Sequence, residues 1–148
     1  MFEKVRKDIA KYGWSSVGVF PSEDNPVSPF TYSIGFLEHD HPELIVSGLP
    51  PTTAHQIIAG LYHRVKDGAR FEAGQLDTEV LEGFEVKFQA LPPDGRPLNM
   101  TRRFYGRDEV PALQVLWPDR EGLFPDDPGC DPRMAVRQDL SFVRDEDD

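Results

Sequence analysis

Proton-active side chains gather in one short stretch of this chain, Glu38-His39-Asp40-His41-Pro42-Glu43. A histidine exchanges protons near neutral pH, and a neighbouring carboxylate raises its pKa and orients its ring. The sequence therefore makes His41 and Glu43 candidates for general acid–base chemistry and for ligand binding, with Tyr32 and Ser33 sharing the site. The same pattern is also explained without chemistry, if the proline begins a strand and the carboxylate caps the chain or faces water. Both interpretations stay open at this point.

Metal binding is a second chemistry that this stretch suggests. His39 and His41 are two residues apart, so both point to one side of an extended segment, a spacing found in metal sites. His55 and His63 are eight residues apart on a predicted helix, about 12 Å along its axis, which is too far to share an ion. We expect no metal site, and His39 and His41 are the candidate ligands if one exists.

Two later segments carry polar and aromatic side chains that suit a ligand. Arg102 and Arg103 precede Phe104-Tyr105, and guanidinium groups bind phosphate or carboxylate while aromatic rings stack. Gln114 and Asp119 lie close in sequence to Trp117. These residues predict a small anionic or aromatic ligand, with a solvated turn and a buried indole anchor as the structural alternatives.

The familiar catalytic signatures are missing from the sequence. There is no nucleophile-elbow Gly-x-Ser-x-Gly, no P-loop, and no Gly-x-Gly-x-x-Gly of a dinucleotide fold. Cys130 is the single cysteine, so neither an internal disulfide nor a cysteine metal cluster can form. Whether the protein is an enzyme stays open.

The secondary structure that must position these residues follows from hydrophobic periodicity and turn chemistry. Apolar spacing predicts helices over residues 2–12 and 53–66, with shorter helices at 98–105 and 133–142. Alternating or continuous apolar runs predict strands at 14–20, 30–37, 43–49, 83–91 and 112–117, and a short extended piece at 70–73. We expect an α+β fold with two or three packed helices on a largely antiparallel, barrel-like sheet of five or six strands.

Composition limits the class of protein and its partners. The chain has 148 residues and a net charge of −10, which predicts one globular domain over residues 1–142 and an acidic disordered tail over 143–148. A negative field of this size argues against nucleic acid and anionic membranes as partners. No signal peptide or membrane span is recognisable, so we expect a cytoplasmic protein, and a homo-oligomer is compatible with the sequence.

The same segments resemble the bacterial family known as domain of unknown function 4262. The resemblance rests on Tyr12-Gly13-Trp14, Phe30-Thr31-Tyr32-Ser33-Ile34-Gly35, His41-Pro42-Glu43-Leu44, Gly48-Leu49, Leu113-Gln114-Val115, Trp117-Pro118-Asp119, Gly122, Phe124-Pro125 and Gln138. It spans roughly residues 8–140. The chain departs from the family pattern at Asp126, where an aromatic residue is expected. The resemblance implies no particular activity.

Two functions of different class are consistent with the sequence. The first is a small-ligand site around His41-Pro42-Glu43 on a split-barrel-like sheet, with a flavin-type cofactor, suggested by the order of elements between residues 14 and 67 and by the arginine cluster. The second is a non-catalytic acidic module, of the immunity type, that binds a basic protein.

Overall fold

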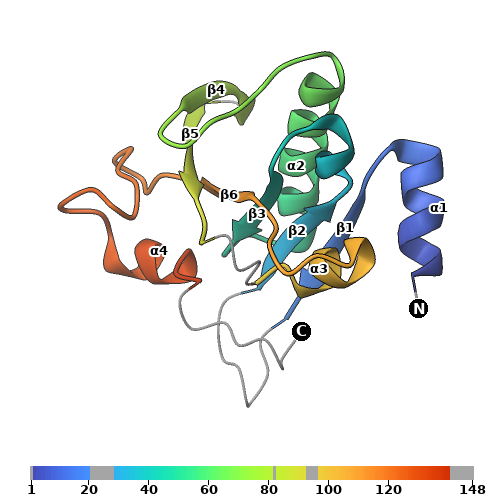
Figure 1. Cartoon of the computed structure of the whole chain (residues 1–148). Helices are drawn as coiled ribbons and strands as arrows, with labels where there is room; N and C mark the ends of the chain where they lie inside the picture. The colour runs from blue at the N-terminus through green and yellow to red at the C-terminus, as the bar shows by residue number, and fades with distance from the viewer. Residues whose placement is uncertain (1, 21–28, 82, 93–96, 141–148) are drawn as a thin grey trace.

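A six-stranded sheet organises the chain. The computed structural model describes residues 2–20, 29–81, 83–92 and 97–140. In chain order its elements are α1 (Glu3–Tyr12), β1 (Ser15–Val19), β2 (Phe30–Ile34), the 3-10 helix η1 (Phe36–His39), β3 (Glu43–Ser47), α2 (Pro51–Lys66), β4 (Leu76–Leu81), β5 (Phe84–Ala90), α3 (Asn99–Tyr105), β6 (Ala112–Leu116) and α4 (Pro132–Arg137). The predicted α+β class is confirmed (Figure 1).

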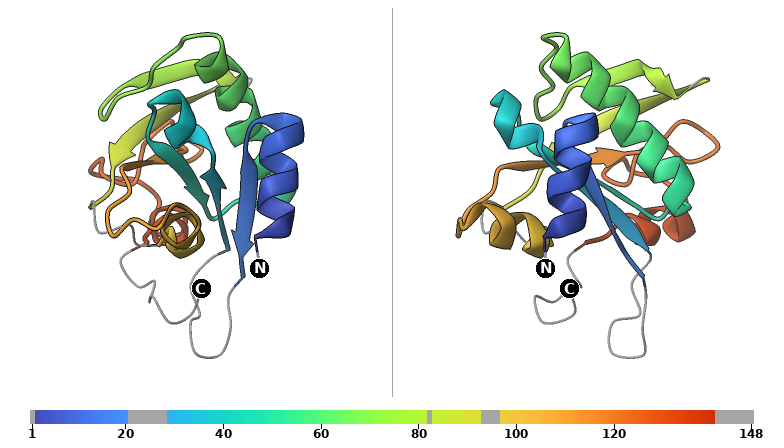
Figure 2. Two further views of the ribbon diagram at one scale, coloured as in Figure 1. Left: turned by 45° about the vertical axis from the view of Figure 1, so that its right-hand side comes forward. Right: turned by 90° about the vertical axis from the view of Figure 1, so that its right-hand side faces the viewer.

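The strands are ordered β1-β2-β3-β6-β5-β4, and the sheet is open. Four of its five strand pairs are antiparallel, as expected, whereas β3 and β6 run parallel with Leu44 opposite Leu113. The expectation of a barrel is wrong. Closure would require β1 to pair with β4, but these strands are the two edges, and α1 flanks β1 instead (Figure 2).

Helix α2 covers one face of the sheet and forms the larger core. Its predicted apolar stripe is confirmed, with buried side chains at Ala54, Ile57, Ile58, Leu61 and Val65. These side chains belong to the same cluster as the alternating inward residues of the central strands, Leu44, Val46, Val86, Phe88, Leu113 and Val115. The helix begins at Pro51, two residues before the predicted start, because proline is tolerated in a first turn. None of the helices in the described ranges is long and apolar enough to cross a membrane.

The opposite face carries a second, smaller cluster beneath α3. Phe30, Tyr32 and Ile45 pack there with Leu98, Val110 and Ala112. Two hydrogen bonds attach α3 to β2: the Met100 amide donates to the Tyr32 hydroxyl at 3.1 Å, and the Thr101 hydroxyl donates to the Ser33 carbonyl at 3.0 Å. Because neighbouring strand residues point to opposite faces, the two clusters use alternate positions of the same strands.

Three local predictions differ from the structure. Strand β4 was not predicted, since it is an edge strand whose side chains are mostly exposed and lack a clean alternation. The end of the predicted strand at 30–37 is the 3-10 helix η1, and α4 ends at Arg137 rather than residue 142. The predicted acidic tail lies outside the described residues.

Replacing Gly35 tests how tightly the start of η1 packs against the connection between α1 and β1. Gly35 has φ +130°, and a Cβ there would lie 2.8 Å from both the Gly13 carbonyl oxygen and the Trp14 Cα. Gly68 is a matched control, with φ +110° and open space around its Cα. Both alanine variants incur left-handed strain, but Gly35→Ala also creates a steric clash. We expect it to lose roughly 2 kcal/mol more unfolding free energy than Gly68→Ala in urea titrations. Equal losses would contradict this packing.

Candidate functional site

Glu43 is at the centre of the predicted site and is completely buried. Its side chain is 0% exposed, and four donors converge on its two oxygens. Oε1 accepts from the Ser33 hydroxyl at 2.6 Å and the Phe36 amide at 3.0 Å. Oε2 accepts from the Gly35 and Leu37 amides, both at 3.1 Å. Burial raises the pKa of Glu43 to about 7, and the hydrogen bonds oppose a larger rise.

This arrangement follows from the local sequence. The amides of Gly35, Phe36 and Leu37 enter the 3-10 helix η1, so their N–H groups have no partner inside that helix. Gly35 supplies the positive φ that turns the chain into η1. Ser33 accepts from the Leu44 amide at 2.9 Å while donating to Glu43, so its hydroxyl joins β2 to β3. The carboxylate therefore caps η1 from the neighbouring strand.

His41 is also buried, at 2% exposure, and both of its ring nitrogens have backbone partners. Nε2 lies 3.0 Å from the Phe71 amide, which can only donate, so Nε2 must accept. Nδ1 then carries the proton and donates to the Pro42 carbonyl at 2.7 Å. Burial lowers the pKa of His41, so the neutral ring is favoured. The ring is held by backbone on both sides and no hydrogen bond joins it to Glu43.

The other histidines have separate neighbours. His39 Nε2 lies 3.0 Å from the Tyr62 hydroxyl, and His55 stacks on Trp14 with its Nδ1 3.1 Å from the Ser16 hydroxyl. His63 packs edge-on against Tyr62. Among the described residues, no group of three or more histidine, cysteine, aspartate or glutamate side chains could hold a metal ion.

The arginine cluster lies on α3, on the face of the sheet opposite α2. Arg102 contacts the Asn99 side-chain oxygen, whereas Arg103 is exposed. Tyr105 donates to Glu38 at 2.8 Å, and burial together with this contact raises the pKa of the phenol. Tyr32 is fully buried with its hydroxyl at the start of α3. Tyr32 and Tyr105 thereby attach α3 to β2 and η1.

Gln114, Trp117 and Gln138 form a polar joint where β6 meets the end of α4. The Gln138 side chain accepts from the Trp117 amide at 2.9 Å and donates to the Trp117 carbonyl at 2.8 Å, as a paired strand would. The Trp117 indole donates to the Ser47 carbonyl at 2.8 Å. Gln114 Nε2 donates to the Gln138 carbonyl at 2.7 Å. Residues from the ends of β3, β6 and α4 are thereby held together.

Asp119 organises the loop after β6. Its carboxylate accepts from the amides of Glu121, Leu123 and Asp131, each at 2.9 Å. These backbone donors lower the pKa of Asp119. The carboxylate is therefore engaged by its own loop.

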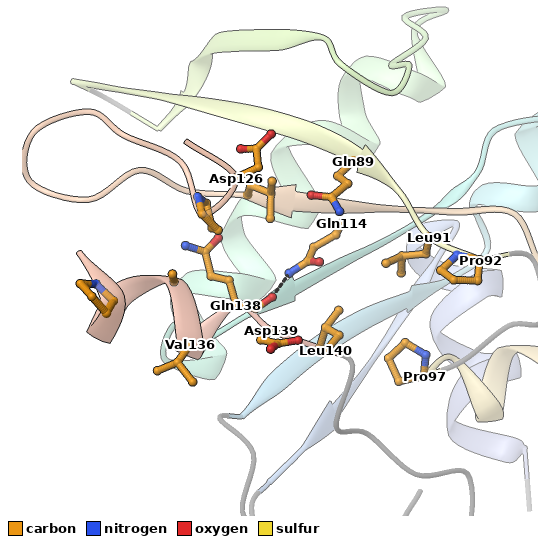
Figure 3. A pocket seen from close by; sticks show the side chains of 14 residues that line it. Gln89, Leu91, Pro92, Pro97, Gln114, Asp126, Val136, Gln138, Asp139 and Leu140 are labelled. Carbon is orange, nitrogen blue, oxygen red and sulfur yellow. Dashed lines mark hydrogen bonds between the residues drawn. The ribbon is translucent and has the colours of Figure 1, made fainter. Parts of the chain in front are cut away.

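A cavity of about 710 Å³ lies between β5, β6 and the α4 segment (Figure 3). Its walls include Leu91, Leu116 and Leu140, and its polar groups include the amides of Gln89 and Gln114. Gln89 and Gln114 are direct cross-strand partners, and their side chains lie side by side in Figure 3. A second cavity of about 350 Å³ lies between β1 and α2, beside Ser16 and His55.

The predicted site residues are divided among five places. Tyr32, Ser33 and Glu43 belong to the region where β2, η1, β3 and α3 meet, while His41 lies beside Phe71. Arg102 and Arg103 are on α3, and Trp117 and Asp119 are at and beyond the end of β6. Gln114 is the one predicted residue that lines the larger cavity.

Sequence reasoning missed Gln89 as a candidate. It is an exposed residue of β5, and only its register opposite Gln114 brings it to the cavity. The alternation of Phe84, Val86 and Phe88 with polar residues shows which face of β5 is apolar, but not which strand lies beside it.

The comparisons with known proteins establish the family. The family model described as Domain of unknown function (DUF4262) matches residues 8–131, and the chain belongs to this family. This match includes the Glu43 centre, the His41 contacts and Gln114. No curated protein and no solved structure matches the chain.

Replacing Glu43 with glutamine tests its structural role. The glutamine amide would turn two N–H donors toward backbone amides that also donate, leaving buried donors unpaired. We expect Glu43→Gln to lose about 2–4 kcal/mol of unfolding free energy. The measurement is urea denaturation at pH 8, above the Glu43 pKa of about 7. The exposed Glu72→Gln is the control and should change stability by less than about 0.5 kcal/mol. Equal stability of the two variants would show that the four hydrogen bonds to the Glu43 carboxylate do not stabilise the fold.

His41 should remain neutral and in the Nδ1–H tautomer. Its folded pKa is lowered, whereas the unfolded chain takes up a proton near pH 6.5. Below about pH 6.5 the unfolded state therefore binds more protons, and this residue makes stability fall as the pH falls. Nitrogen-15 NMR of the imidazole reports both the tautomer and the titration. Titration at or above pH 6.5, or an Nε2–H tautomer, would contradict the assignment.

Proposed function

We propose that the protein binds a small uncharged organic molecule in the cavity between β5, β6 and α4. The volume of about 710 Å³ lies within the range of roughly 300–1,000 Å³ that is usual for ligand sites. Apolar walls with a few convergent polar groups are the usual composition of such sites.

The observation that carries this proposal is the side chain of Gln114. It is 4% exposed, and its Nε2 is engaged by the Gln138 carbonyl. Within the described part of the chain its Oε1 has no hydrogen-bond partner. This oxygen is not among the fully buried atoms that lack a partner in the described residues, so it is open to the cavity and can accept a hydrogen bond from a bound molecule or from water. The side-chain amide of the strand partner Gln89 also has no hydrogen bond in the described ranges, so this amide and Oε1 of Gln114 are available to a ligand.

The charges around the cavity favour an uncharged ligand over an anionic one. Asp126 and Asp139 line the cavity, and none of the described lining residues is lysine or arginine. Asp126 is itself paired with Lys87 at 2.7 Å. A flavin therefore fits through its ring rather than through a phosphate, and Arg102 and Arg103 on α3 do not contribute to this lining.

His41 and Glu43 have structural roles in this proposal, because all their polar atoms are occupied by backbone and by Ser33. The proposed activity is binding, in the cytoplasm, with no catalytic step. The alternative is a module that binds a basic protein partner, and the net charge of −10 favours it through electrostatic steering.

The test combines ligand detection with matched variants. We expect the purified protein to release a small molecule detectable by mass spectrometry, or to gain thermal stability with uncharged heterocycles such as riboflavin. Gln114→Met and Gln89→Met should each raise the ligand concentration that is needed for this stabilisation about tenfold. Gln56→Met, at an exposed position on α2, should leave it unchanged.

Two results would oppose the proposal. A protein free of small molecules that gains no stability with any compound of an uncharged heterocycle panel has no such site. Binding that survives both cavity variants lies elsewhere. Saturable binding of basic proteins without small-molecule binding would favour the alternative.

A further inference from the structure

We infer that the ligand is a planar ring with a cyclic amide edge, an N–H beside a C=O, and that it carries no phosphate. This inference rests on the proposed function and names the chemistry of its ligand. The inference follows from the positions of the side-chain atoms of Gln89 and Gln114 that have no hydrogen bond in the described residues.

The free atom of Gln114 is an acceptor. An amide side chain can be drawn in two orientations, but the Gln138 carbonyl can only accept a hydrogen bond. The atom that faces this carbonyl at 2.7 Å must therefore be the amide nitrogen (Figure 3). Oε1 remains for the cavity, so the ligand must present a donor to it.

Gln89 supplies the complementary group. Directly opposite residues in an antiparallel pair have Cβ atoms about 4.5–5.5 Å apart, and Gln89 is the partner of Gln114. Its amide is exposed and can rotate to donate its N–H beside the acceptor of Gln114. A ligand edge with a donor and an acceptor on adjacent atoms satisfies both glutamines, whereas a carboxylate has no donor for Gln114.

The remaining lining suits a flat, uncharged body. Leu91, Leu116 and Leu140 with Pro92 and Pro97 give apolar contact, and side chains without donors cannot hold a second polar edge. None of the described lining residues is a lysine or arginine that could bind a phosphate, and the nearby Lys87 is already paired with Asp126 at 2.7 Å.

The experiment compares matched ring compounds by fluorescence titration and thermal shift. Lumiflavin has the cyclic amide edge, N3-methyl-lumiflavin lacks its N–H, and FMN adds a phosphate to riboflavin. We expect lumiflavin to bind at least tenfold more tightly than its N3-methyl form, and riboflavin more tightly than FMN. Gln89→Met should weaken the binding of both rings, because both keep the C=O that accepts from Gln89. Because Gln89 is exposed, this variant should fold even if Gln114→Met does not.

The outcomes separate this inference from the proposed function. Equal binding of the methylated ring, or tighter binding of FMN, overturns the cyclic amide edge while the cavity remains a ligand site. The cyclic amide edge is also overturned if an uncharged ring without an amide binds while lumiflavin and uracil do not. The cavity remains a ligand site in that case too. No binding by any compound overturns both.

Discussion

The buried carboxylate of Glu43 is the interaction on which the other features depend. It begins β3, next to the parallel partner β6, and its oxygens hold Ser33 at the end of β2 and three amides at the start of η1. Its own amide donates to the Pro111 carbonyl at 3.0 Å, just before β6. One residue thus joins three strands and a 3-10 helix, and removing it would leave several buried donors unpaired.

The rest of the polar stretch follows from this anchor. Once η1 is fixed, the chain returns through Asp40, the one described non-glycine residue with a positive φ, and places His41 against the Phe71 amide. The proton-active residues that are densest in sequence are therefore used to build the fold. Among the described residues that line the larger cavity, the side-chain amide of Gln89 and Oε1 of Gln114 have no hydrogen bond, close to where Gln138 attaches the end of α4 to Trp117.

Local patterns predicted much of the fold. The stripe on α2 and the strands around residues 30–34, 43–47, 84–90 and 112–116 were recognisable because periodicity reports burial directly. The parallel pairing of β3 with β6 was not recognisable in the sequence. It joins segments that are separated by two strands and two helices, and no local signal encodes the register between them. The same limit applies to the site. Residue types identified His41, Glu43 and Gln114, but only tertiary contacts distinguish an occupied carboxylate from an amide with a free oxygen.

Amide hydrogen exchange of Gly35, Phe36 and Leu37 tests the central role of Glu43 most directly. Amides at the start of an exposed 3-10 turn exchange rapidly, whereas donors to a buried carboxylate exchange only when the structure opens. We predict that all three exchange as slowly as the Leu44 amide in the middle of the sheet, at the rate of global unfolding. Rapid exchange of these three amides while Leu44 stays protected would contradict the account.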